Sequence, residues 1–313
     1  MKRKLLTLLF LGALFGCSKA DVVSDDTDGV AIDFNNVQTR AAITDASQIQ
    51  DFGVWGFVED YTIFNGDKVY KEGGVYKYDT PRYWMKDMSY SFFAVHPYGT
   101  PVTIDETGET RGYSIAFDTP VAADVDLMTA HKDVIASVDS EGNYPTVDLK
   151  FAHALSLVKL QIAKHGKNSE NRIVITSIVL GGISKSGTYN TLTNEWSDHN
   201  GSISLSTANI TLDNGDITFH EVITGMFVPQ SINYNTVSIR INYDFYTSNG
   251  EGEWVPDEES YTANSYLPIG EWEPSKSYVY KLTLSAVDNN ISFKSPEVAT
   301  WGTPNPSGTI IIQ

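Results

Sequence analysis

The side chains best suited to chemistry in this chain do not stand at the spacings that catalysis or metal binding needs. The six histidines occur singly, with no pair at metal-ligand spacing: His96, His131, His153, His165, His199 and His220. Five carboxylates flank Trp254 in residues 251–259 and could suggest the paired acids of a glycoside hydrolase, but a solvated loop explains them better. No nucleophile elbow, phosphate-binding loop or dinucleotide fingerprint occurs. We therefore predict a protein without catalytic residues, metal or cofactor.

The only cysteine, Cys17, stands where an apolar run ends. Three basic residues precede that run (residues 5–15), which is too short to cross a bilayer. Residues 1–16 are thus predicted to be a secretory signal peptide. The tetrad Leu14-Phe15-Gly16-Cys17 resembles a bacterial lipobox, in which the cysteine receives a diacylglycerol and becomes the first residue. An ordinary signal peptide with an incidental cysteine is the alternative. A lipid on Cys17 would tether the protein, since each buried methylene contributes about 0.8 kcal/mol.

The composition of the chain excludes several classes of protein. The chain has 313 residues, a net charge of −17 and 41% hydrophobic residues, enough to bury a core. One cysteine excludes an intramolecular disulfide and a cysteine-based zinc site, and the negative charge argues against nucleic-acid binding. Removal of residues 1–16 takes away three positive charges and no negative ones, so the charge becomes −20. Residues 17–29 are small, polar and acidic, which indicates a solvated tether; their carboxylates do not fit a calcium loop.

The elements that must position any site are predicted to be strands. Alternation of apolar and polar residues recurs at residues 30–34, 147–151, 158–162, 237–245 and 278–284. Turn sequences separate these stretches, and no window sustains an amphipathic helix of three turns. The pattern predicts an all-β protein built from sandwiches.

A domain boundary is predicted near residue 165. The alternation changes parity between Leu157 and Val158, as a bulge or a change of sheet would produce. A polar run follows at residues 165–171. This gives an N-terminal sandwich of residues 30–165 and a C-terminal sandwich of residues 166–313. We interpret His153, within the apolar stretch 151–155, as a hydrogen-bonded structural histidine.

The six tryptophans fall into two groups. Three lie beside polar or loop residues and are candidates for stacking against sugar rings: Trp196, Trp254 and Trp272. The alternative is that they cover sheet edges. The other three are interpreted as core residues: Trp55, Trp84 and Trp301.

Several blocks, in order along the chain, resemble the fimbrillin family, the lipoprotein subunits of surface pili in Gram-negative gut and oral bacteria. Besides the lipobox they are Thr39-Arg40-Ala41, FGVWGF (52–57), YW (83–84) with YSFFAVHP (90–97), DLMTA (126–130), LKFAHAL (149–155), and YVYKLTL (278–284) with VATW (298–301). Met85 departs from the pattern, since relatives commonly have proline after the Tyr-Trp pair. No block is specific alone, but the ordered set covers nearly the whole chain.

The resemblance implies two transthyretin-like β-sandwich domains in tandem and assembly by strand exchange. In that family an arginine-specific protease removes the N-terminal segment up to an arginine, and a neighbour's strand fills the apolar groove that opens. Here the resemblance implies processing between Arg40 and Ala41. The removable first strand would be residues 30–40, with Val30, Ile32 and Phe34 facing inward.

The other end of the chain offers a candidate donor strand. After two prolines it closes with Thr309-Ile310-Ile311-Ile312-Gln313, a short segment of strong β-propensity. The alternative is that residues 30–40 form a permanent strand and residues 309–313 complete their own sheet.

These expectations describe a lipid-anchored pilus subunit of the outer-membrane surface that mediates adhesion and is not an enzyme. Its expected partners are other pilin subunits, the outer membrane through lipid, an arginine-specific protease, and a host surface protein or glycan. The alternative is a surface glycan-binding lipoprotein of a polysaccharide-uptake system.

Overall fold

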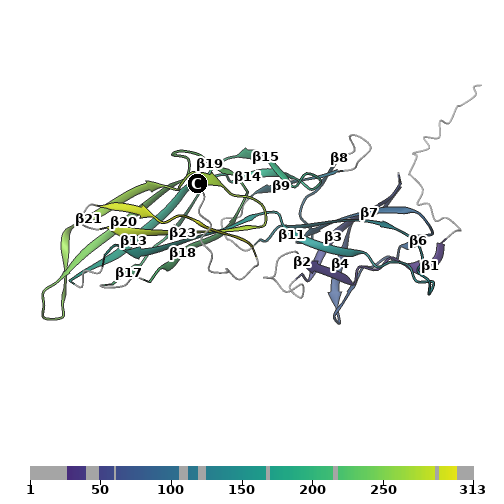
Figure 1. The fold of residues 1–313 in the computed structure, drawn as a ribbon, viewed down its shortest axis with the longest axis horizontal. Coiled ribbons are helices and arrows are strands. Elements are labelled where there is room, and N and C mark those ends of the chain that lie inside the picture. The colour runs from purple at the N-terminus through teal and green to yellow at the C-terminus, as the bar shows by residue number, and fades with distance from the viewer. Residues whose placement is uncertain are drawn as a thin grey trace, which may run out of the picture.

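The computed structural model describes residues 27–39, 49–59, 61–105, 112–118, 125–166, 170–213, 218–285 and 289–301. Every regular element in these residues is a strand, so the all-β prediction is confirmed. Figure 1 shows an elongated molecule, with the early strands gathered in one half and the late strands in the other. None of the described residues forms a helix long and apolar enough to cross a membrane. Several predicted site residues lie outside the described residues: Cys17, Arg40, Ala41, Ile310, Ile311 and Ile312.

A seven-stranded sheet forms the frame of the N-terminal half, in the order β2-β11-β10-β7-β3-β4-β5. Its strands are β2 (Asn36–Thr39), β3 (Asp51–Val58), β4 (Tyr61–Glu72), β5 (Val75–Lys77), β7 (Ser89–His96), β10 (Met128–Ile135) and β11 (Asp148–His153). All neighbours are antiparallel except β2 and β11, which are parallel. A separate antiparallel pair joins β1 (Thr27–Ala31) to β6 (Tyr83–Met85).

The largest side chains in the core of this half are aromatic. Phe52, Phe64, Phe92 and Phe151 are fully buried together with Trp84. Gly56 allows the rings to approach β3, because a Cβ there would lie 2.8 Å from the ring of Phe64.

Two five-stranded sheets pack face to face in the C-terminal half. One contains β12 (Ser156–Lys164), β18 (His220–Phe227), β23 (Lys276–Ser285), β24 (Asn290–Phe293) and β25 (Glu297–Thr300). The other contains β13 (Asn171–Ile183), β16 (Ile203–Thr207), β17 (Ile210–Leu212), β20 (Ser238–Ser248) and β21 (Trp254–Tyr266). Two short strands, β19 (Ser231–Ile232) and β22 (Gly270–Glu271), form a separate antiparallel pair, and Ile232 is buried in the same core.

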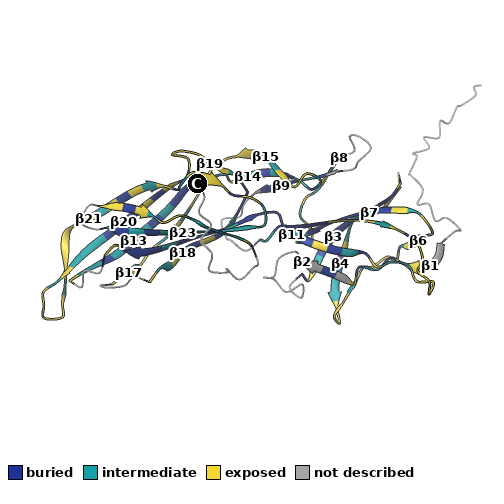
Figure 2. Cartoon of the chain, viewed as in Figure 1, coloured by how far each residue is buried: buried dark blue, intermediate teal, exposed yellow. Residues whose placement is uncertain are grey.

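Apolar residues of both sheets form one core, so this half is a sandwich. The alternation predicted in residues 158–162, 237–245 and 278–284 supplies much of that core, through β12, β20 and β23. Figure 2 shows buried residues running through these strands, whereas the end of the hairpin formed by β20 and β21 is exposed.

A four-stranded sheet joins the two halves, in the order β15-β14-β9-β8. Its strands β8 (Thr103–Asp105) and β9 (Gly112–Asp118) precede the predicted boundary, whereas β14 (Ser186–Asn190) and β15 (Glu195–Asn200) follow it. A buried cluster between the halves takes residues from both sides, including Val95, Ile115, Tyr189 and Val228. The halves are therefore connected by hydrogen bonds and by a core, in addition to the chain itself.

The chain changes sheet at Ala154–Leu155, between β11 and β12, and not near residue 165. β12 pairs with β18 and β23, so it belongs to the C-terminal sandwich. The parity change at Leu157 and Val158 follows from this change of sheet. The polar run that suggested residue 165 is the connection from β12 to β13 inside one sandwich.

Candidate functional site

The segment of residues 27–39, called the N-terminal segment below, lies across the core of the N-terminal half. Its first part, β1, pairs with β6, and its last part, β2, pairs with β11. Residues 32–35 between them belong to no strand. The prediction of one continuous strand over residues 30–40 is therefore wrong in this respect.

Three side chains of the segment enter the core. Ile32 and Phe34 are 2% and 1% exposed, and Val37 is also buried. Val30 is 43% exposed, so the predicted inward position is wrong there. Two features around it disturb a regular alternation: the β1–β6 register shifts between Thr27 and Ala31, and Gly29 has a φ of +71°.

Phe34 occupies a cage of aromatic rings. Its ring meets those of Phe52, Phe64, Tyr78 and Phe92 edge to face, with centroids 6.3, 5.5, 5.8 and 5.7 Å apart. Such pairs contribute about 0.5–1.5 kcal/mol each beyond the area that they bury. Phe34 is thus the main anchor of the N-terminal segment.

Four hydrogen bonds fix the backbone and a side chain of residues 32–35. The amide of Ile32 donates to the carbonyl of Arg82 at 2.7 Å, and the Tyr78 hydroxyl donates to the carbonyl of Ile32 at 2.7 Å. The amide of Val147 donates to the carbonyl of Asp33 at 2.7 Å. The amide of Tyr76 donates to Oδ1 of Asn35 at 2.9 Å. Burial raises the pKa of Tyr78, so its hydroxyl stays protonated and able to donate.

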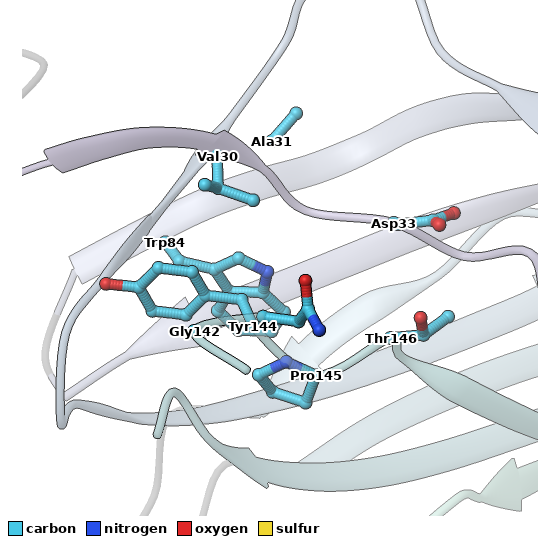
Figure 3. Close-up of a pocket in the computed structure, with 9 residues that line it drawn as sticks. Val30, Ala31, Asp33, Trp84, Gly142, Tyr144, Pro145 and Thr146 are labelled. Carbon is cyan, nitrogen blue, oxygen red and sulfur yellow. The ribbon is translucent and has the colours of Figure 1, made fainter. Parts of the chain in front are cut away.

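The packing of the segment is incomplete at its start. A pocket of about 250 Å³ lies between residues 30–33 and the loop 142–146. Figure 3 shows Val30 above this space and the stacked rings of Trp84 and Tyr144 below it. The N-terminal segment is therefore well packed and hydrogen-bonded from Ile32 onward, and poorly packed at Val30.

The three tryptophans proposed for sugar stacking do not form a common surface. Trp272 is 1% exposed and its Nε1 donates to the Tyr280 hydroxyl at 2.9 Å, so it is a core residue and the prediction is wrong for it. Trp196 is half-buried, and its Nε1 donates to the carbonyl of Ala154 at 2.8 Å. Trp254 lies under the guanidinium of Arg172, 4.4 Å from the ring centroid.

Two more clusters of polar side chains lie among the described residues, around His131 and in residues 251–259. Ser91 and Asp133 both contact Nε2 of His131, at 3.1 Å each, so the ring cannot relay a proton from one to the other. The acidic residues 251–259 lie in the exposed β20–β21 hairpin. No group of histidine, cysteine or carboxylate side chains that could hold a metal occurs among the described residues.

Several residues that hold the segment were not predicted from the sequence. Val37 is buried although the alternation of residues 30–34 points Asn36 inward. No local pattern indicates the roles of Tyr78 and Asn35, because their hydrogen-bond partners are distant in sequence. The YW block was a usable signal, since Tyr83 pairs with Ala31 of β1 and Trp84 lines the pocket.

Comparison with known proteins identifies the family. The model of the fimbrillin-like family matches residues 39–301. A fimbrial protein from Bacteroides vulgatus has a similar fold, with a TM-score of 0.68, 16% identity, and coverage of 87% of this chain and 99% of that one. A proposed cell adhesion protein from Bacteroides ovatus has a TM-score of 0.50 and 15% identity, over 88% of this chain and 98% of that one. A search of curated protein sequences gives no match. The chain belongs to the fimbrillin-like family.

Proposed function

We propose that this fimbrial subunit is a lipoprotein of the outer-membrane surface that assembles by protease-triggered strand exchange and mediates adhesion. The observation that carries the proposal is the placement of the N-terminal segment. It inserts Ile32, Phe34 and Val37 into the core, yet its last strand, β2, lies at the edge of the seven-stranded sheet, where β11 is its one partner strand among the described residues. An edge strand can leave a sheet without separating any other pair.

The proposed cleavage site directly follows this strand. β2 ends at Thr39, and Arg40 is the next residue. Cleavage after Arg40 would leave the N-terminal segment bound only by noncovalent contacts. Its loss would expose the edge of β11 and empty the three buried positions.

An empty groove would be strongly unfavourable. Each large apolar side chain contributes about 1.5–3 kcal/mol when buried, so three vacated positions correspond to roughly 5–9 kcal/mol. This is comparable to the whole stability of a typical domain, which is about 5–15 kcal/mol. A replacement strand therefore has a large driving force to bind.

The C-terminal residues have a suitable pattern for that replacement. In an extended strand Ile310 and Ile312 face the same side, with the two-residue spacing of Ile32 and Phe34. The donor would come from a second subunit, so each exchange adds one subunit to the polymer. Cys17 with its lipid would hold the chain at the membrane until Arg40 is cut.

The test treats the purified protein with an arginine-specific protease and follows two readouts. N-terminal sequencing should find a new terminus at Ala41, and native gels should show a ladder of oligomers. The variant Arg40→Gln should give neither, although the other arginines remain. A chain ending at Pro306 should be cut but should not form the ladder. A ladder from either variant would overturn the mechanism.

Sugar binding through the three tryptophans gains no support from their geometry. Trp272 is inaccessible, and Trp196 and Trp254 are engaged with Ala154 and Arg172.

A further inference from the structure

Three residues far apart in sequence meet where the chain passes from one half to the other. Nδ1 of His153, at the end of β11, lies 2.9 Å from Oδ1 of Asp126, which precedes β10. The ring of His153 stacks on the indole of Trp301, with centroids 3.9 Å apart and planes 11° from parallel. Both ring systems are buried, since the His153 side chain is 1% exposed and Trp301 is 5% exposed.

The hydrogen bond fixes the orientation of the imidazole. A carboxylate only accepts, so Nδ1 carries the proton and donates to Asp126. Nε2 is buried and has no hydrogen-bond partner within the described part of the chain. The ring presents a flat face to Trp301, and Asp126 keeps it from rotating.

Ser275 holds the backbone of Trp301 at the same place. Its carbonyl accepts from the amide of Trp301 at 2.8 Å, while its own amide donates to the carbonyl of Leu155 at 3.0 Å. Its hydroxyl donates to the carbonyl of His153 at 2.7 Å. Ser275 has a φ of +59°, uncommon for a residue with a side chain, and this conformation is what the three bonds stabilise.

Trp301 is the last described residue, and twelve residues follow it, including the candidate donor strand. We propose that Asp126, His153 and Ser275 are positioning residues that hold Trp301 and so fix the position from which the chain continues into residues 302–313. This inference rests on the proposed strand exchange. It adds that Trp301, called the root of the donor below, holds the start of the segment that contains the candidate donor strand at a fixed position. A fixed root reduces the conformational freedom that the donor loses when it enters the neighbour's groove.

The first test measures hydrogen exchange at the amide of residue 301 in the uncleaved protein, relative to the amide of Ile162 in the core. His153→Asn keeps a donor for Asp126 but loses the stacked ring, so the relative exchange rate should rise about 2- to 10-fold. His153→Phe restores a stacking ring and should recover part of the protection. Ile115→Ala, in the same buried cluster on β9, should leave the relative rate unchanged.

The second test compares the rates of oligomer formation after cleavage at Arg40, at equal folded fractions. His153→Asn should be slower than wild type by a similar factor, and Ile115→Ala should not. If the two variants behave alike in either test, the positioning role is wrong. If wild-type protein forms no oligomers, strand exchange fails, but the hydrogen-exchange result still decides whether the anchor exists.

Discussion

Phe34 and Val30 occupy one short segment of backbone but have opposite surroundings. Phe34 touches four aromatic rings, whereas Val30 faces a pocket and is 43% exposed. The energy that holds the N-terminal segment is therefore concentrated in a few side chains.

Replacing Phe34 should weaken the segment far more than replacing Val30. Phe34→Ala removes a fully buried ring, so the free energy of unfolding should fall by about 3–5 kcal/mol. Val30→Ala should change it by less than about 0.5 kcal/mol. Urea denaturation of both variants measures the difference, and equal losses would contradict the assigned anchor.

The Tyr78 hydroxyl should stabilise the N-terminal segment through its hydrogen bond, in addition to the contact of the Tyr78 ring with Phe34. Tyr78→Phe removes the donor to the carbonyl of Ile32 and should cost about 0.5–1.5 kcal/mol. Hydrogen exchange at the amides of Ile32 and Val147 should accelerate. Tyr83→Phe, at an exposed ring, serves as the matched control and should have no effect on these amides.

Buried tyrosines should make the protein sensitive to alkali. Burial raises the pKa of Tyr278 from 10.0 to about 12. The stability that this neutral hydroxyl supplies is complete below pH 10 and is lost as the pH rises toward 12, because the unfolded chain ionises first. The unfolding free energy should therefore fall less steeply above pH 10 in Tyr278→Phe than in wild type. Parallel pH profiles would contradict this assignment.

At the scale of elements, local alternation and long-range pairing differ in how well they can be predicted. The strands β12, β20 and β23 follow from alternating residues that all face one core. Trp272 was misassigned because its polar neighbours suggested a loop, although exposed Glu271 and Glu273 on either side of it already form an alternating pattern. The break at residues 32–35 and the parallel pairing of β2 with β11 depend on distant partners, so no local pattern reveals them.

Gly182 in β13 should be needed for the stability of the five-stranded sheet that contains β13 and β20. Gly182 has a φ of +83°, and a Cβ there would lie 2.1 Å from the carbonyl oxygen of Thr236. Gly182→Ala should lower the unfolding free energy by at least about 1–3 kcal/mol, because both the strain and the clash involve backbone. Gly270→Ala, with no atom within 4 Å of its Cβ position, is the control. A thermal midpoint unchanged in Gly182→Ala would contradict this backbone conformation and the close approach of Thr236.

At the scale of the whole molecule, the two halves have different parts in the proposed assembly. The N-terminal half holds the segment that would be exchanged, and the described part of the C-terminal half ends at Trp301, before the candidate donor in the sequence. The shared sheet β15-β14-β9-β8 connects the halves, so the groove and the root of the donor lie on one joined body. The sequence indicated two sandwiches, but it could not indicate this sheet, whose strands come from both sides of the predicted boundary.

The most direct test of strand exchange places a photoreactive benzoylphenylalanine at position 312, on the face proposed to enter the groove, and mixes labelled with unlabelled subunits after cleavage at Arg40. Irradiation should link position 312 to residues around the vacated Phe34 site of another copy, such as Phe52, Phe64, Tyr78 or Phe92. Isotope labelling of one population identifies links between copies by mass spectrometry. Links only within one chain, or to surfaces away from this site, would contradict strand exchange.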